Sequence, residues 1–390
     1  MQSNNHRLTA TILSMSLLTV MAGAAIAPAL DIIREHFKDA SSMLVQLIVS
    51  IPALLIIITN FLFLPISRKV GSRTIALCGL ALYVAAGAGC FFVDDIIVLL
   101  SLRALLGVSV GLVMPLSTGL LAYYYPPEEQ ARLMGLSAAM NQMGGVVATL
   151  LAGLLANIQW NYAFLVYLLG LIAVVLVALY LPDERLGSAN KRGIPFQPRQ
   201  LLKFHPSVIG MLLVMLIFFV YPTNFAVVTA KTTSLSIESV TLIMCALDVV
   251  AFFVGLVFGQ MMHAARRAMK YFAPLFFLVG YAILAYDSGI VSLLVGSCLI
   301  GLANGVGIPY LNTIASIKGG KNSATTVMPL LSMALYLGQF LSPIIVNPLS
   351  NALFGDSTPA APYIIAIGLS IIYLLQTYST RHFQSLPPEN

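Results

Sequence analysis

Long apolar runs separated by short polar breaks make up most of this chain. Twelve of the runs are long enough to cross the roughly 30 Å hydrocarbon core of a bilayer. Lipid offers the backbone no hydrogen-bond partners, so a spanning segment must be a helix or a barrel strand, and no run shows the strict alternation of a barrel. The pattern predicts an all-α integral membrane protein with spans at residues 9–30, 43–66, 75–93, 96–123, 133–157, 162–181, 207–229, 239–262, 271–287, 290–314, 324–349 and 361–378.

The only long polar stretch between spans runs from Pro182 to Pro206 and leaves six spans on each side. Glycines and prolines of the two halves correspond at an offset of 194 residues in three pairs of spans. We therefore expect two six-helix bundles, residues 1–182 and 207–390, related by a parallel repeat and joined by a cytoplasmic linker at 183–206. Repeats of this kind place a transport site between the halves, near the middle of the membrane.

The repeated glycines and prolines have a second interpretation, because small residues let helices approach closely and proline kinks a helix. For each residue alone, packing is the better explanation, and the argument for transport comes from the repeat. The expected hinge and packing positions are Pro28, Gly107, Gly111, Pro115, Gly144, Pro222, Gly301, Gly305, Pro309, Gly338 and Pro343.

Composition and charge agree with a membrane location. Of the 390 residues 59% are hydrophobic and 9% charged, whereas soluble domains carry about 25% charged residues. If the N-terminus lies inside, sixteen of the 20 Lys and Arg residues fall in inside segments and three in outside segments. The positive-inside rule then places both termini in the cytoplasm, and the net charge of +6 is a topology signal and not a nucleic-acid footprint. His6 and Arg7 ahead of the first run are also typical of a signal peptide, but we expect a retained helix.

Enzyme chemistry has little support in the sequence. The four cysteines lie in apolar runs without metal-ligand spacing and are expected to be small core residues. The five histidines lie in loops or at helix ends and form no metal cluster. The segment from Lys318 to Ser323 is glycine-rich and basic, but it lacks the spacing of a phosphate-binding loop. We predict no enzyme activity, no cofactor and no metal, and transport driven by ion gradients instead of ATP.

Charged residues inside a span cost about 2.5–3.5 kcal/mol on insertion scales, so each is a functional candidate. Asp248 lies near the middle of its span, where desolvation favours the protonated form of a carboxyl, and it is the candidate for proton exchange. Arg103 does not lose its charge. It is expected to pair with an anion or to hydrogen-bond carbonyls freed at Pro28. Asp31, at the outer end of the first span, is a weaker proton-coupling candidate that also fits an ordinary membrane-interface residue.

Uncharged polar residues within spans are candidates for a substrate-binding cavity, although about half are expected to form interhelical hydrogen bonds instead. They are Gln46, Asn60, Asn141, Gln142, Tyr221, Asn224, Asn304, Tyr310, Asn312, Tyr336 and Gln339.

Four segments resemble conserved motifs of the major facilitator superfamily, and more narrowly of its twelve-helix drug:proton antiporters. The segment Leu102–Gly107, with Gly111 and Pro115, resembles the family's fourth-helix Arg-x-x-x-Gly motif, and the resemblance implies a role in proton translocation for Arg103. The other matching segments are residues 125–132, residues 160–164 with 181–184, and residues 338–343.

Two family motifs are altered. After the second span, Arg68 stands where the family has Asp, and Leu64 where it has the first Gly. The charge clamp of that motif is therefore expected to be lost or rebuilt. In the fifth span, Ala148 and Thr149 replace the Gly-Pro of the antiporter motif, while Gly144 and Gly153 remain.

Together these features predict a secondary transporter, and we favour proton-coupled efflux of small amphipathic or hydrophobic compounds by alternating access. The alternatives are a proton-coupled importer of a small metabolite and a lipid flippase of the same fold. We expect a monomer in a bacterial inner membrane, with protons, a small-molecule substrate and the lipid bilayer as partners.

Overall fold

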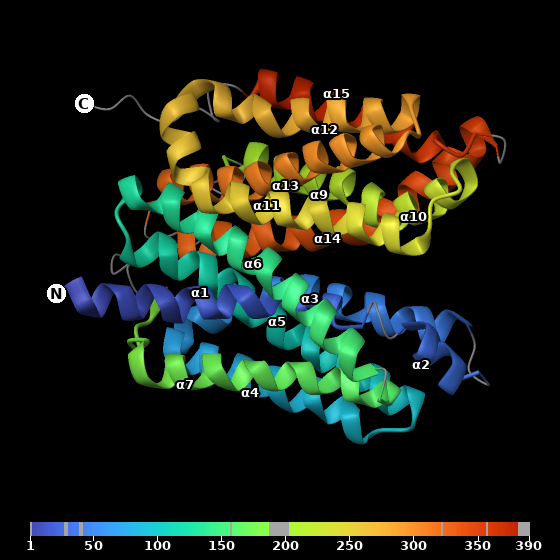
Figure 1. Ribbon diagram of the computed structural model, residues 1–390. Coiled ribbons are helices and arrows are strands. Elements are labelled where there is room, and N and C mark those ends of the chain that lie inside the picture. Colours follow the sequence, from blue (N-terminus) through green and yellow to red (C-terminus); the bar gives the residue numbers. More distant parts are fainter. Residues whose placement is uncertain are drawn as a thin grey trace. The chain divides into compact units, whose positions relative to one another are not determined.

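The computed structural model describes residues 2–26, 30–38, 42–156, 158–186, 203–320, 323–355 and 358–380, and all of their regular structure is helical (Figure 1). In the first half the elements are α1 (Gln2–Ala24), α2 (Leu30–His36), α3 (Ser42–Lys69), α4 (Ser72–Gly89), η2 (Cys90–Phe92), α5 (Ile96–Tyr124), α6 (Pro127–Ala156), η3 (Trp160–Leu169) and α7 (Gly170–Tyr180). In the second half they are α9 (His205–Phe218), α10 (Val220–Thr232), α11 (Ile237–Ala265), η5 (Arg266–Ala268), α12 (Met269–Tyr286), α13 (Ile290–Gly319), α14 (Ser323–Phe354) and α15 (Ala361–Ser379).

The predicted all-α membrane fold is confirmed. Eleven stretches of the described chain are helical, long and apolar enough to cross a bilayer. The remaining predicted span, 43–66, falls on α3, where Ser50–Phe63 forms a shorter apolar helical stretch.

Three predicted spans are less regular than uniform apolar runs suggest. The first run divides into α1 and α2, and Pro28, which was expected to kink it, lies outside the described residues. The sixth begins with a ten-residue 3-10 segment, η3, before α7. The seventh is interrupted at Phe219, between α9 and α10. Pro222 explains this interruption, because it has no N–H to offer the carbonyl four residues earlier.

The chain groups into two compact units. One contains residues 1–126, 140–196 and 318–333, and the other contains 127–139, 197–317 and 334–390. In the first unit α4 runs beside α7, and in the second α12 runs beside α15 (Figure 1). Likewise, α1 contacts α7 and α9 contacts α15. The same helix pairings thus recur in each unit, as a repeat of six spans requires.

Close glycine contacts repeat in the same way. A Cβ added at Gly107 would lie 2.5 Å from the Pro52 carbonyl oxygen, and one at Gly301 would lie 2.4 Å from the Leu247 carbonyl oxygen. The two glycines are 194 positions apart (301 − 107) and the two carbonyls 195 (247 − 52).

Gly144 and Gly338 form a second pair of this kind. An added Cβ would lie 1.9 Å from the Leu17 carbonyl oxygen in the first case and 2.5 Å from the Leu212 carbonyl oxygen in the second. These carbonyls are again 195 positions apart (212 − 17). The repeat seen in the sequence is therefore a repeat of backbone contacts.

An acid from a distant segment caps the helix that follows the altered motif. Asp183, in the segment after α7, accepts hydrogen bonds from the backbone N–H groups of Arg73 and Thr74 at 3.2 and 3.4 Å. The Thr74 hydroxyl donates to its other carboxylate oxygen at 3.3 Å. Gly71 leaves the space for this, because a Cβ there would lie 2.0 Å from the Asp183 Oδ1. Asp183 therefore caps the N-terminus of α4 from a distant part of the chain.

Other helix ends carry local caps. Asp95 precedes α5 and accepts from the N–H groups of Ile97 and Val98, both at 2.9 Å. Before α13, the Ser292 hydroxyl and the Gly289 N–H donate to Asp287. These two hydrogen bonds hold the pKa of the Asp287 carboxyl below its ordinary value.

The expectation that all four cysteines are core residues is wrong for three of them. Cys90 is buried, whereas Cys78 and Cys245 are exposed and Cys298 is half-buried. In a membrane protein an apolar helix face can point to lipid as easily as to the core, so the apolar surroundings in the sequence did not decide burial.

Candidate functional site

Arg103 lies on α5 and is completely buried. Its Nε donates to the Ile48 carbonyl at 2.9 Å, and its Nη1 donates to the Ala22 carbonyl at 3.0 Å and to the Tyr167 hydroxyl at 2.7 Å. Its Nη2 has no hydrogen-bond partner within the described part of the chain. The guanidinium thus joins α1, α3 and η3 to α5, and the recorded acceptors are neutral groups.

Two tyrosines extend the hydrogen-bonded network that begins at Arg103. Tyr167 also donates its hydroxyl to the Ala22 carbonyl at 2.9 Å, and Tyr83 donates to the Leu18 carbonyl at 3.1 Å. The two rings meet edge to face with centroids 5.5 Å apart. The Ala22 carbonyl, close to the end of α1, therefore receives both a guanidinium and a phenol.

The second unit contains a matching arrangement without the positive charge. Ser297 stands at the position that corresponds to Arg103, and its Oγ lies 2.7 Å from the Tyr221 hydroxyl oxygen. The Ile217 carbonyl, 195 positions after Ala22 (217 − 22), accepts from the Tyr281 hydroxyl at 2.7 Å. In each half, a side chain from another helix therefore donates a hydrogen bond to the backbone carbonyl at this repeated position.

The break between α9 and α10 is held by hydroxyl groups. Pro222 cannot donate to the Phe218 carbonyl, and the Tyr281 hydroxyl lies 3.5 Å from that oxygen. On α14, the Ser342 hydroxyl donates to the Leu216 carbonyl at 2.8 Å. Carbonyls around the break thus gain donors from α12 and α14, which is how an interrupted helix is tolerated in a membrane.

Asp248 lies on α11 and is half-buried. Among the side chains that the structure describes, it is the one carboxyl in the middle of a membrane span. Its charge interacts with the Tyr221 hydroxyl and with the Cys245 thiol. Leu247, its neighbour, brings its carbonyl oxygen against Gly301, so the backbones of α11 and α13 are in close contact beside the carboxyl. Within the second unit, the structure thus places Asp248 close to Tyr221 and beside the part of α13 that contains Ser297.

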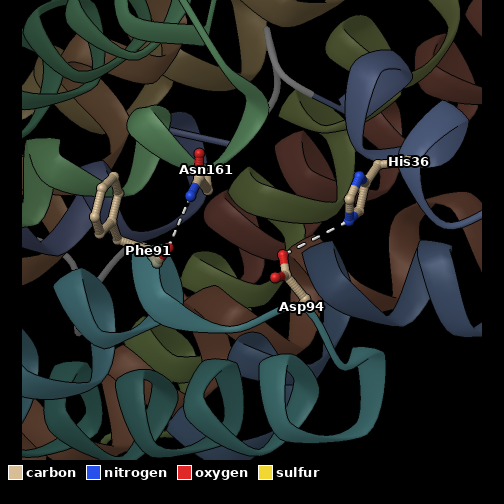
Figure 2. A network of polar contacts seen from close by, with 4 residues as sticks. All are labelled: His36, Phe91, Asp94 and Asn161. Carbon is tan, nitrogen blue, oxygen red and sulfur yellow. Dashed lines mark hydrogen bonds and ion pairs between the residues drawn. The ribbon is translucent and has the colours of Figure 1, made fainter.

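Asp31, the third charged candidate, lies on α2, and its side chain is outside the described residues. The end of α2 is tied to neighbouring connections (Figure 2). His36 stacks on Trp160 with ring centroids 4.5 Å apart. Its Nε2 lies 3.8 Å from Asp94 Oδ1, as Figure 2 shows. Figure 2 also shows Asn161 donating to the Phe91 carbonyl at 2.8 Å, which links η3 to η2.

The polar candidates of the first half are partly used in hydrogen bonds. Asn60 is buried and donates to the Ser332 hydroxyl at 3.0 Å, and its Oδ1 has no partner among the described atoms. Asn141 accepts from the Thr19 hydroxyl at 2.8 Å. Gln142 is half-buried on α6. The side chain of Gln46 is outside the described residues.

The polar candidates of the second half also include some that form hydrogen bonds within the protein and some with an atom that has no partner in the described part of the chain. Asn224 donates to the Val220 carbonyl and the Thr223 hydroxyl of its own helix. Asn304 is buried, and its Oδ1 has no partner among the described atoms. The rest are buried or half-buried within their helices, namely Tyr310, Asn312, Tyr336 and Gln339. A cavity lining that joins all these residues stays a prediction.

Sequence reasoning missed Tyr83, Tyr167, Tyr281 and Tyr363, all of which are buried. A weak signal existed, since Tyr167 and Tyr363 are nearly one repeat apart (363 − 167 = 196). Ser297 was noticed only as the counterpart of Arg103, and its hydrogen bond to Tyr221 was not predicted. A tyrosine in an apolar run is equally compatible with lipid contact, so the sequence alone did not single these residues out.

Comparisons with known proteins agree with this architecture. The family model described as Major Facilitator Superfamily matches residues 12–343. The Quinolone resistance protein NorA of Staphylococcus aureus (strain MSSA476) is 25% identical over 330 residues, which cover 78% of this chain and 79% of the relative. The Multidrug transporter protein MdtP of Bacillus subtilis (strain 168) is 25% identical over 128 residues, 31% of this chain and 24% of the relative.

Solved structures share the fold at low identity. The human organic anion transporter MFSD10 (TETRAN) superposes with a TM-score of 0.76 and 15% identity, covering 95% of this chain and 99% of the other. The proton:xylose symporter XylE, bound to 6-bromo-6-deoxy-D-glucose, gives a TM-score of 0.78 and 16% identity, covering 97% and 96%. With the repeated helix contacts and the family match over most of its length, this chain belongs to the major facilitator superfamily and is a transport protein rather than an enzyme.

Proposed function

We propose that this protein is a proton-coupled exporter of small amphipathic or hydrophobic compounds, working by alternating access in a bacterial inner membrane. The observation that carries the proposal is the similarity to a quinolone resistance protein over 78% of the chain. A shorter match to a multidrug transporter supports it.

The site chemistry supports proton coupling through Asp248. A coupling residue must change its charge during the cycle, and a carboxyl in mid-span can do so. Asp248 is such a carboxyl and is only half-buried, which supports access to it from a transport cavity. Arg103 does not meet the first condition, because a guanidinium stays charged. Its bonds to α1, α3 and η3 suit a residue that fixes the bundle around the α1–α2 break.

The scarcity of charge supports an apolar or weakly polar substrate. Among the described side chains the middle of the spans contains Arg103 and Asp248 as charged groups, and the Arg103 guanidinium is fully buried and already donates to two backbone carbonyls and the Tyr167 hydroxyl. A strongly anionic substrate would require several free cationic groups. A lipophilic cation, in contrast, requires aromatic or apolar surface and one carboxylate.

The test is uptake of a fluorescent lipophilic cation into proteoliposomes with an acidic interior, with wild type compared with Asp248→Asn. Efflux of protons from the lumen should drive accumulation of the dye by wild type. Asp248→Asn keeps the size of the side chain and removes its exchangeable charge, so its accumulation should fall to the level of empty liposomes. Uptake must also disappear in wild type when an ionophore collapses the pH gradient.

Each result has a definite meaning. Equal gradient-driven uptake by both proteins would exclude Asp248 as the coupling residue and leave the exporter proposal standing. No uptake by wild type would contradict proton-coupled export of this class. The importer and flippase alternatives would then be tested with metabolite uptake and with lipid scrambling in the same vesicles.

A further inference from the structure

A chain of hydroxyl groups in the second unit has a fixed direction. The Ser297 Oγ lies 2.7 Å from the Leu293 carbonyl oxygen, which can only accept. The one proton of the serine hydroxyl is therefore committed to Leu293. The Tyr221 hydroxyl, also 2.7 Å from the Ser297 Oγ, must then be the donor in that bond. With its proton used, the Tyr221 oxygen remains only as an acceptor.

This chain of hydroxyl groups is shielded from water and lies beside an ionisable group. Tyr221 is 2% exposed and Ser297 is 0% exposed. Asp248 interacts electrostatically with the Tyr221 hydroxyl, and the contact of Leu247 with Gly301 sets α11 against α13 one turn after Ser297. Among the described side chains, further titratable groups close to Tyr221 or Asp248 include Cys245 on α11, Cys298 on α13, Tyr281 on α12 and Tyr363 on α15.

We propose that Tyr221 and Ser297 form a positioning pair that responds to the protonation state of Asp248. A protonated carboxyl has an O–H to donate to an oxygen that can only accept, so it is compatible with the Tyr221–Ser297 bond. A carboxylate has no such proton and attracts the Tyr221 hydroxyl proton instead, which breaks the bond to Ser297. Tyr221 keeps its proton throughout, and only the acceptor of its hydrogen bond changes.

The position of Tyr221 gives this exchange a structural consequence. Tyr221 lies two residues after the interruption at Phe219, in the first turn of α10. Its bond to Ser297 anchors that turn to α13, so loss of the bond frees α10 to move at the break. The inference depends on the proposed role of Asp248 in coupling, and it names the residues through which its proton acts on α10.

Cys245 offers a direct measure of the Asp248 charge in the full-length protein. It lies three residues before Asp248 and is exposed, and its thiol interacts electrostatically with that carboxyl. The rate at which a small uncharged maleimide labels Cys245 should therefore show an inflection with pH where Asp248 ionises. Peptide-resolved mass spectrometry on protein in lipid nanodiscs separates Cys245 from the other cysteines. Asp248→Asn should abolish the inflection.

Ser297→Ala is the decisive variant. It releases the Tyr221 proton from Ser297 and makes it available to the Asp248 carboxylate. One hydrogen bond to a charged group should move the inflection lower by about one pH unit. In a Tyr221→Phe background the same serine change should cause no further movement of the inflection.

Two other substitutions at Ser297 support the test. Ser297→Thr retains the hydroxyl and should keep the wild-type inflection. Ser297→Cys places a weaker hydrogen-bond acceptor at this position and should move the inflection in the same direction as Ser297→Ala. It replaces Ser297→Ala in the test if that variant does not fold.

Ser370→Ala is the matched control, because Ser370 is also buried and donates to its own helix, to the Ala366 carbonyl at 2.7 Å. It should leave the inflection in place. An inflection that does not move in Ser297→Ala and Ser297→Cys, or that moves equally without the Tyr221 hydroxyl, would overturn the positioning pair.

Dye uptake by the same variants separates the two proposals. Uptake that requires Asp248, with an unmoved inflection, would contradict the positioning pair alone. The expected shifts without uptake by wild type would contradict the exporter proposal alone.

Discussion

At the scale of single residues, a cation inside a membrane protein needs acceptors that remain acceptors at every pH. Arg103 has them in two backbone carbonyls and the Tyr167 hydroxyl. The sequence predicted Arg103 as a special residue because a charge interrupts an apolar run. It left carbonyls and an anion open as partners, because which helices approach α5 depends on packing between distant segments. The tyrosines were not predicted for the same reason.

Tyr167→Phe should destabilise the protein measurably. The change removes an acceptor from the Arg103 Nη1 and a donor from the Ala22 carbonyl, while the Nη2 already lacks a partner among described atoms. A hydrogen bond to a charged group contributes about 1.5–3 kcal/mol in soluble proteins. Interhelical hydrogen bonds in membranes average about 0.6 kcal/mol, so we expect a loss of about 1–2 kcal/mol in the free energy of unfolding.

Denaturant unfolding of detergent-solubilised protein measures this loss. Tyr286→Phe is the control, since Tyr286 is 94% exposed and its hydroxyl should not contribute. If both variants unfold at the same denaturant concentration as wild type, the phenol does not help to hold the guanidinium.

At the scale of helices, the glycine pattern predicted which positions correspond but not what they contact. The structure supplies the contacts, which are carbonyl oxygens at an offset of 195 residues in the partner helices. The helix breaks were predicted less well. Pro222 was identified as a hinge or packing residue, but the donors to the carbonyls around the interruption at Phe219, the hydroxyl groups of Tyr281 and Ser342, come from other helices and were not predicted.

Gly144→Ala and Gly338→Ala should both destabilise their units, and Gly144→Ala should do so more strongly. The new Cβ would lie 1.9 Å from a carbonyl oxygen at Gly144 and 2.5 Å at Gly338, so the helices must move apart. Overpacking of this kind costs about 1–3 kcal/mol. At Gly368, on α15, nothing lies within 4 Å of an added Cβ, and alanine there should be neutral or stabilising by up to about 1 kcal/mol.

Thermal unfolding of the three alanine variants provides the measurement. A midpoint for Gly144→Ala at or above that of Gly368→Ala would contradict the close crossing of α1 and α6.

Asp183→Ala should weaken the N-terminal end of α4. Without the carboxylate, the N–H groups of Arg73 and Thr74 lose their acceptor, and loss of a cap costs about 1 kcal/mol. Asp183→Asn keeps one carbonyl oxygen and should recover part of the loss. Amide hydrogen exchange at the first turn of α4 should rise in Asp183→Ala and less in Asp183→Asn. Equal protection in all three proteins would show that Asp183 does not cap this helix.

At the scale of the whole molecule, length and hydrophobicity were sufficient to predict the fold, because a bilayer allows few ways to satisfy the backbone. The repeat was predicted because each half must build the same helix crossings from a similar sequence. The boundaries of the two units are harder to predict from the sequence, since contacts group residues 127–139 with the second unit and 318–333 with the first. The sequence places its boundary at the linker, 183–206, and this division stays a prediction.

Orientation in the membrane is argued from the whole chain, since it follows from the sum of loop charges rather than from any single contact. The excess of Lys and Arg on one side predicts that the α12–α13 connection faces outside and that the segment after α7 faces inside. Ser288 and Arg185 are exposed residues in these two segments. In a background without the four native cysteines, Ser288→Cys should react with a membrane-impermeant maleimide added to intact cells. Arg185→Cys should react only after permeabilisation, and the opposite pattern would reverse the topology and with it the direction in which the proposed proton gradient drives transport.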